Sequence, residues 1–151
     1  MTKVFSDPEV MRFGDGPHGP AWIRAWIERQ VESNRREPGH GLWAVVEKDS
    51  STAMGYCGLF RFPDLSGQPE MELGYRLGRA HWGCGYATEA AIAVRDHGFE
   101  ALGFARLVSL IDPNNTASIR VAEKAGMVFE KEVMLEGYTH PDHLYVVHAQ
   151  G

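Results

Sequence analysis

Cysteine is scarce in this sequence of 151 residues. Only Cys57 and Cys84 occur, and they do not form a Cys-x-x-Cys pair. Two cysteines so far apart argue against a disulfide scaffold and are typical of a protein from a reducing compartment. We therefore expect both to be free thiols.

Long hydrophobic runs are absent as well. No stretch reaches the roughly 18 consecutive apolar residues of a transmembrane helix. Met1 to Phe13 carries acidic residues and a proline, where a signal peptide needs an unbroken apolar segment. The sequence thus predicts a cytoplasmic protein with no membrane partner.

Positive charge is in the minority. Lys and Arg number 15 against 20 Asp and Glu, which gives a formal net charge of -5. Without a general positive field, the chain is not drawn to nucleic acid or anionic lipid. A neutral or cationic partner fits better.

Internal repeats, low-complexity segments and Pro/Ser-rich linkers are also missing. The chain is long enough to bury a core without disulfide or metal staples, and 44% of its residues are hydrophobic. The sequence therefore predicts a single domain over residues 1–151.

Hydrophobic periodicity and turn residues divide the chain into helices and strands. Residues 7–13 suggest a short helix, the glycines and prolines of Gly14–Pro20 predict a loop, and apolar residues then recur at helical spacing. Gly103 and Gly126 follow later helices at positions where a left-handed residue ends a helix. The predicted order is helix 7–13, helix 21–37, strands 42–47, 55–62 and 71–77, helix 86–102, strand 106–111, helix 116–125, and strands 127–134 and 144–148.

The order of these elements predicts the fold class. The three strands before residue 78 form an antiparallel meander. The strand 71–77, the helix 86–102 and the strand 106–111 predict a right-handed parallel unit, so the sheet is mixed and helices lie on its faces. In such α/β folds, ligands bind at the carboxyl ends of strands.

The turn at one of these strand ends is Trp82-Gly83-Cys84-Gly85-Tyr86-Ala87-Thr88-Glu89. Its glycines let successive backbone N–H groups face one concavity, and the next helix adds its N-terminal partial charge, so the turn can bind phosphate. A tight connection without a ligand is the alternative. ATP and NAD fit poorly, because no Gly-Lys-Ser/Thr is present and Thr88 replaces the third glycine of the dinucleotide fingerprint.

A second motif, Asp112-Pro113-Asn114-Asn115-Thr116-Ala117-Ser118, continues to Phe129. Together with residues 82–90, it resembles the GNAT superfamily of acetyl-CoA-dependent N-acetyltransferases, and within it the RimJ/RimL-like branch. The resemblance implies a mixed, mostly antiparallel sheet with one parallel strand-helix-strand unit and helices on both faces. It also implies transfer of an acetyl group from acetyl-CoA to a primary amine, directly in a ternary complex. A catalytically silent acyl-CoA-binding module is the alternative.

The family pattern assigns the acetyl-CoA site residue by residue. Leu77 and Asn115 would line the channel for the pantetheine arm from opposite sides. Lys124 matches a position near the nucleotide, although a solvated lysine on an exposed helix face suits the sequence equally well. Backbone amides would hold the pyrophosphate at Gly83, Cys84, Gly85, Tyr86, Ala87 and Thr88.

Glu72 matches the glutamate of the family's Glu-x-Gly-Tyr strand and is our choice of general base. Period-two alternation places Glu72 and Gly74 on one face, where the glycine would leave room for a substrate beside the carboxylate. Glu70 shares that face and is the second candidate, and a surface glutamate is the alternative interpretation of Glu72. A backbone N–H between Tyr75 and Leu77 would stabilise the oxyanion.

Many relatives supply the acid for the departing thiolate from a tyrosine, but Ala122 occupies the matching position here. Ser118 can donate a hydrogen bond to sulfur and is the candidate, with a small polar residue in the first turn of a helix as the alternative. Cys84 lies in the phosphate turn and Cys57 has no histidine partner near it in sequence, so a covalent thiol route is unsupported.

The amine acceptor is either a protein N-terminus or a small molecule. By family analogy, the loops 14–20 and 136–142 would form its pocket. Plausible metal ligands are His140, Asp142 and His143, with His148 beyond them, but Pro141 and the loop around it favour surface histidines, so no metal is expected.

Relatives open with a strand rich in Leu and Arg, and Met1 to Phe5 is too short to supply it. Either the sheet has lost an edge strand, leaving an exposed ladder that invites a homodimer, or the start of the sequence is internal.

Overall fold

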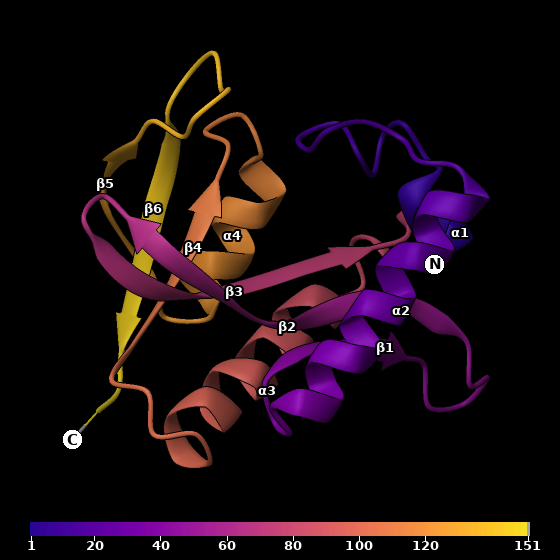
Figure 1. Ribbon diagram of the computed structural model, residues 1–151, viewed down its shortest axis with the longest axis horizontal. Coiled ribbons are helices and arrows are strands. Elements are labelled where there is room, and N and C mark those ends of the chain that lie inside the picture. The colour runs from indigo at the N-terminus through magenta and orange to yellow at the C-terminus, as the bar shows by residue number, and fades with distance from the viewer. Residues whose placement is uncertain (151) are drawn as a thin grey trace.

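The computed structural model describes residues 1–150 as a six-stranded sheet with helices packed against it (Figure 1). The helices are α1 (Thr2–Phe5), α2 (Pro20–Arg36), α3 (Tyr86–Glu100) and α4 (Thr116–Lys124), with a 3-10 helix at Arg79–His81. The strands are β1 (Gly41–Val46), β2 (Ala53–Leu65), β3 (Gln68–Leu77), β4 (Arg106–Ile111), β5 (Val128–Val133) and β6 (Asp142–His148). Within these 150 residues, no helix combines the length and the apolar character needed to cross a membrane.

The strands lie in the order β1-β2-β3-β4-β6-β5. Every neighbouring pair is antiparallel except β3 and β4, which are parallel and are connected through α3. The predicted meander, crossover unit and mixed sheet are therefore confirmed. The β2–β3 hairpin is longer than predicted, because Ser66 and Gly67 have positive φ angles of 53° and 92° and reverse the chain in two residues.

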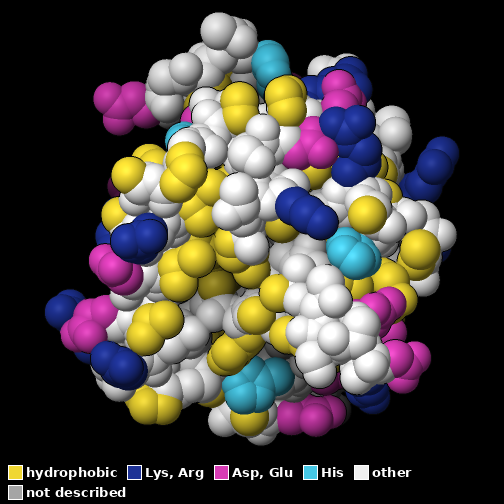
Figure 2. All heavy atoms as spheres, turned by 90° about the vertical axis from the view of Figure 1, so that its right-hand side faces the viewer, with side chains coloured by type: hydrophobic (Ala, Val, Ile, Leu, Met, Phe, Trp, Pro, Cys, Tyr) yellow, Lys and Arg dark blue, Asp and Glu magenta, His cyan; other side chains and the backbone are white. Residues whose placement is uncertain are grey.

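The helices cover both faces of the sheet. Tyr56 of β2 packs with Phe5 and Ile23 on the side of α1 and α2, whereas the next residue, Cys57, packs with Ala91 on the side of α3 and α4. Successive residues of a strand point to opposite faces, so the two helix pairs lie on opposite sides. Figure 2 shows the side with α1, α2 and β1, where hydrophobic side chains gather around the centre of the face and charged side chains lie mostly toward its edges.

The end of the β2–β3 hairpin adds to the core of the other half of the sheet. Leu65 packs with Val108 of β4 and Leu144 of β6, and all three side chains are nearly excluded from solvent. The hairpin thereby ties the first three strands to the last three.

The front of the chain differs from the prediction. Residues 8–13 form turns rather than a helix, and the helix α1 precedes them. The Asp7 Oδ1 accepts a hydrogen bond from the backbone N–H of Glu9 at 2.9 Å, and the same carboxylate pairs with Arg79. A side chain that binds the local backbone in this way competes with helix formation. Met11 is only 1% exposed, and its burial draws the segment into the core.

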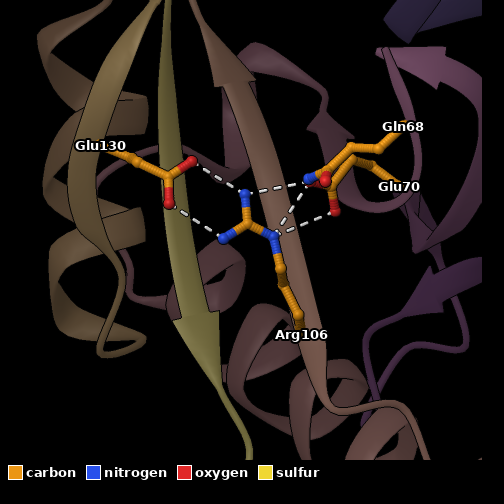
Figure 3. A network of polar contacts seen from close by, with 4 residues as sticks. All are labelled: Gln68, Glu70, Arg106 and Glu130. Atoms are coloured by element: carbon orange, nitrogen blue, oxygen red, sulfur yellow. Dashed lines mark hydrogen bonds and ion pairs between the residues drawn. The ribbon is translucent and has the colours of Figure 1, made fainter. Parts of the chain in front are cut away.

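Arg106 joins three strands at the beginning of the β3–β4 pair (Figure 3). Its Nε donates to both carboxylate oxygens of Glu70, at 3.0 and 3.2 Å, and its Nη1 and Nη2 donate to the two oxygens of Glu130, at 3.0 and 2.8 Å. Gln68 donates a further hydrogen bond to Glu70 at 2.6 Å. These contacts, here called the Arg106 clamp, hold β3, β4 and β5 together at the end where β3 and β4 start.

Candidate active site

The strands β3 and β4 separate soon after they meet. The structure records one pair between them, Glu72 with Val108. In a continuing parallel ladder, the next hydrogen bond would run from the Leu110 N–H to the Leu73 carbonyl. Instead, Ser109 Oγ donates to the Leu73 carbonyl at 2.6 Å, and the Leu110 N–H donates to Glu72 Oε1 at 3.4 Å. A hydroxyl and a carboxylate thus take the place of backbone partners, and the strands diverge.

A cavity of about 320 Å³ occupies the gap between the diverging strands. Its walls include Tyr56 and Phe60, which pack on the side of α1 and α2, and Ala122 and Met127, which pack on the side of α3 and α4. The cavity therefore passes between β3 and β4 and reaches residues from both faces of the sheet. We call it the acceptor cavity.

Glu72 lies in the wall of the acceptor cavity. Burial raises the pKa of Glu72 to about 7, the hydrogen bond from the Leu110 N–H works against this rise, and the negative charge of Asp142 adds to it. A carboxylate with a pKa near neutrality is well suited to accept a proton from a substrate, because a general base is most effective when its pKa is close to the working pH.

Two details around Glu72 differ from the sequence-based expectations. Glu70, the second candidate base, is 7% exposed, is engaged by Arg106 and does not line the acceptor cavity. Gly74 does line it, but a Cβ built there would collide with the ring of Phe60. The Phe60 ring therefore occupies the space beside Gly74 that was expected to be open for a substrate.

A second cavity, of about 530 Å³, lies at the carboxyl end of β3 and the start of α3. It is lined by most of the residues that the sequence assigned to acetyl-CoA, namely Leu77, Gly83, Gly85, Tyr86, Ala87, Thr88, Asn115 and Lys124. Cys84 is the exception. It is exposed, its thiol donates to the Trp82 carbonyl at 3.5 Å, and it is not part of the lining.

The turn before α3 has the geometry of an anion site. Gly83 and Gly85 have φ angles of 73° and 83°, in the left-handed region that favours glycine. Gly85 precedes the first helical residue and provides no side-chain cap, so the first N–H groups of α3 are left for a ligand. The Tyr86 hydroxyl donates to Glu47 at 3.2 Å, so the contribution of Tyr86 to the turn is its backbone. These features fit a pyrophosphate.

Asn115 and Ser118 lie at the start of α4. The Asn115 Oδ1 accepts a hydrogen bond from the Ser118 N–H at 3.2 Å, so Asn115 caps the helix as well as lining both cavities. Ser118 also lines both cavities. Lys124 is exposed at the other end of α4 and lines the second cavity only.

The sequence pointed to the backbone of Tyr75 as a possible oxyanion donor but gave no role to its side chain. Like Ser118, it lines both cavities, so these two residues lie where the cavities adjoin. Burial raises the pKa of the Tyr75 hydroxyl to about 12, against the opposing effect of the nearby Ser118 hydroxyl. Among residues 1–150, the Tyr75 hydroxyl has no well-formed hydrogen bond. The signal was available, because Tyr75 ends the Glu72-Leu73-Gly74-Tyr75 motif.

The direction of the Tyr75 backbone N–H follows from its position in β3. Leu73 directs its carbonyl toward β4, and residues two apart in a strand share a direction, so the Tyr75 N–H also faces β4. A continuing ladder would pair this N–H with the Leu110 carbonyl. The recorded pair between β3 and β4 is Glu72 with Val108, so the Tyr75 N–H is directed toward the diverging part of the junction, where an oxyanion donor is predicted.

Residues of both predicted acceptor loops reach the acceptor cavity, Gly14 from one and Tyr138 from the other. Next to them, Asp112, His140 and Asp142 place one ligand atom each within 4.8 Å of one another. His143, which the sequence analysis grouped with His140, instead lies 3.7 Å from Glu132.

Comparisons with known proteins identify the family and the fold. The sequence model of a family described as "Acetyltransferase (GNAT) domain" matches residues 1–128. The chain is 41% identical over 132 residues to the uncharacterized protein YkkB of Bacillus subtilis (strain 168), covering 86% of this chain and 74% of YkkB. It is 34% identical over 139 residues to the uncharacterized N-acetyltransferase p20 of Bacillus licheniformis, covering 91% and 76%. The crystal structure of an acetyltransferase (GNAT family) from Bacillus anthracis superimposes with a TM-score of 0.83 at 23% identity, covering 98% of this chain and 86% of that one.

Proposed function

The chain belongs to the GNAT acetyltransferase family, and on that premise we propose that it moves an acetyl group from acetyl-CoA directly to a primary amine, either a protein N-terminus or a small molecule. The observation that supports this most strongly is the meeting of the two cavities at Tyr75 and Ser118, with Glu72 in the wall of the acceptor cavity. The motif Trp82-Gly83-x-Gly85 supports assignment to the RimJ/RimL-like branch.

The second cavity is the proposed site of acetyl-CoA, which supplies the reactive thioester. The N–H groups of residues 83–88 would hold its pyrophosphate, with Lys124 near the nucleotide end. Leu77 and Asn115 would line the path of the pantetheine arm toward Tyr75.

Four groups would divide the chemistry: the Glu72 carboxylate in the wall of the acceptor cavity, and the Tyr75 N–H, the Tyr75 hydroxyl and the Ser118 hydroxyl where the two cavities meet. Glu72 takes the proton of the amine, so that the nitrogen lone pair can attack the acetyl carbon. The Tyr75 N–H donates to the acetyl oxygen as negative charge develops on it. The hydroxyls of Tyr75 and Ser118 donate hydrogen bonds to the departing sulfur. Because the pKa of Tyr75 is about 12, above the roughly 8.5 of an ordinary thiol, its role is to stabilise the thiolate by a hydrogen bond rather than to give up its proton.

The cysteines support direct transfer over a thiol intermediate. Burial raises the pKa of Cys57 to about 12, which suppresses the nucleophilic thiolate, and Cys84 lines neither cavity.

The test combines binding and turnover in Glu72→Gln. Acetyl-CoA at about 100 times Kd should stabilise both proteins by about 2.7 kcal/mol against thermal unfolding, since Glu72 is not part of the acetyl-CoA site. Release of free thiol in the presence of a panel of amines should fall about 10²- to 10⁴-fold in the variant.

Unchanged turnover in Glu72→Gln would remove Glu72 as the base. Stabilisation by acetyl-CoA without thiol release with any amine would instead favour an acyl-CoA-binding module.

A further inference from the structure

Asp142 is a buried carboxylate with one unpaired oxygen among residues 1–150. It is the first residue of β6, is 7% exposed and lines the acceptor cavity. Its Oδ1 receives no hydrogen bond from residues 1–150. A buried carboxylate costs several kcal/mol unless a cation or hydrogen-bond donors compensate it, so one with an unpaired oxygen in the wall of a cavity points to a positively charged ligand.

The neighbouring acid, Asp112, is better satisfied. Its Oδ1 accepts hydrogen bonds from the backbone N–H and the side-chain amide of Asn114, at 2.8 and 3.1 Å, and its Oδ2 lies 3.3 Å from His140 Nε2. Asp112 lines the same cavity as Asp142. The two carboxylates therefore form one acidic wall, at the end of β4 and the start of β6, in which Asp142 is the member with an unpaired oxygen.

The remaining charged residues of the acceptor cavity lie on β3. Glu72 is the proposed base, and Arg76 is the cation. The Arg76 guanidinium donates to Met11 Sδ at 3.1 Å, so it is held against the N-terminal segment rather than against the acidic wall. Tyr138 and Phe62 also line the cavity, and aromatic faces attract organic cations.

Building on the proposed function, we propose that the acceptor is an aliphatic diamine, with one amino group at Glu72 and the second, as an ammonium ion, held by Asp142 and Asp112. The reacting amino group loses a proton to Glu72, the C–N bond forms, the C–S bond breaks and the sulfur leaves as the thiolate, to which that proton can return. The second ammonium group is unchanged, and its role is to position the first.

A divalent metal ion is the other cation that the cluster Asp112, His140 and Asp142 could attract. The organic cation is favoured for two reasons. His140 is 44% exposed, so the cluster offers only two well-sheltered ligands, and both of these lie in the cavity that contains the proposed base.

The experiment compares 1,4-diaminobutane with 1-aminobutane, which has the same carbon chain and lacks the second amino group. Thiol release with saturating acetyl-CoA should give kcat/KM at least about tenfold higher for the diamine. In Asp142→Asn this ratio should fall close to one. Asp64→Asn changes an exposed aspartate near the end of β2 that lines neither cavity, and it should keep the ratio of the parent.

The ratio of two substrates cancels any general loss of active protein, and Asp112→Asn provides a second variant if Asp142→Asn does not fold. Equal turnover of both amines by the parent, or an unchanged ratio in Asp142→Asn, would overturn the diamine proposal while the acetyltransferase proposal stands. Thermal stabilisation by MnCl₂ alone that Asp142→Asn abolishes, without a preference for the diamine, would identify a metal site and also overturn it. If neither amine releases thiol although acetyl-CoA binds, the proposed function itself fails.

Discussion

At the scale of single residues, the burial of Glu72 has opposite consequences for activity and stability. It raises the pKa of the carboxyl from 4.5 to about 7. A proton acceptor with this pKa is effective near neutrality, but the folded protein must hold a charge in a poorly solvated place. The burial that suits Glu72 to the proposed role of base thus also makes its ionised form destabilise the fold.

Activity should therefore depend on pH through Glu72. We expect kcat/KM to rise with pH up to about 7 and to level off above it, because only the ionised carboxylate accepts a proton. The pH profile of thiol release measures this, and the residual activity of Glu72→Gln should not show the same limb.

The same pKa predicts a stability effect of the opposite sign. Between pH 4.5 and about 7 the folded state binds more protons at Glu72 than the unfolded state, so the free energy of unfolding falls as pH rises. Above pH 7 the full penalty, at most about 3 kcal/mol, is present. Glu72→Gln should thus be more stable than the parent in urea denaturation at pH 8, and the difference should shrink toward pH 4. A variant less stable at pH 8 would contradict the assignment of the raised pKa.

Tyr75 allows a separate prediction. A hydrogen bond to a charged group contributes about 1.5–3 kcal/mol, so Tyr75→Phe should lower kcat by about 10- to 100-fold. Stability should change little, because within residues 1–150 the hydroxyl makes no well-formed hydrogen bond that the substitution would remove. Measuring kcat together with the thermal stabilisation by acetyl-CoA separates an effect on turnover from an effect on binding. Comparing Tyr75→Phe, Ser118→Ala and the double variant measures the coupling between the two hydroxyls. If the loss is in acetyl-CoA binding instead, Tyr75 acts only as a wall of the cavity.

At the scale of elements, the N-terminus of α3 is the part of the fold that suits an anion. Gly85 has a φ of 83° and a Cβ there would meet no atom within 4 Å, so a side chain is strained by the backbone but not by crowding. Substitutions of Gly85 can therefore distinguish the effect of an added charge on ligand binding from the effect of added size.

Gly85→Glu should abolish the stabilisation by acetyl-CoA, because its carboxylate repels the pyrophosphate. Gly85→Gln has the same size and the same backbone strain without the charge, and should retain part of the effect. Thermal unfolding with and without acetyl-CoA measures both variants. Equal losses in the two would show that bulk alone blocks the site and that the turn exerts no electrostatic preference.

At the scale of the whole molecule, two half-sheets meet at one parallel pair. The strands β1, β2 and β3 form one half and β4, β6 and β5 the other, and the Arg106 clamp crosses the junction at its closed end (Figure 3). The open end of the same junction contains the acceptor cavity. The Arg106 clamp thus stabilises one end of the junction, while β3 and β4 diverge at the other end.

Removing the clamp should destabilise the fold strongly. Arg106→Met leaves Glu70, which is 7% exposed, as a buried charge without its cation, and such a change typically costs about 3–5 kcal/mol. Urea denaturation measures it. Arg61→Met provides the control, because the pair of Arg61 with Glu37 is exposed and should be worth at most about 1 kcal/mol. Adding Glu70→Gln to Arg106→Met should restore part of the loss, and no recovery would mean that the charge of Glu70 is not the cause.

Much of this protein is determined by local patterns that the sequence carries by itself. Helical spacing predicted α2, and strand patterns with turn residues predicted the meander. The glycines at 83 and 85 predicted the open turn before α3, because a positive φ excludes most other residues. The motif at 72–75 drew attention to Glu72 through its resemblance to the family, and this residue lines the acceptor cavity.

Only the tertiary structure decided the properties that depend on distant residues. Strand alternation could not distinguish Glu72 from Glu70, since both lie on one face of β3, and only the resemblance to the family motif favoured Glu72. Packing directs Arg106 to one of them and the acceptor cavity to the other. The place of Asp142 in the wall of the acceptor cavity and the meeting of Tyr75 with Ser118 also join segments far apart in the chain. Spacing and propensity describe neighbours in sequence, whereas burial, pKa and charge compensation arise from neighbours in space.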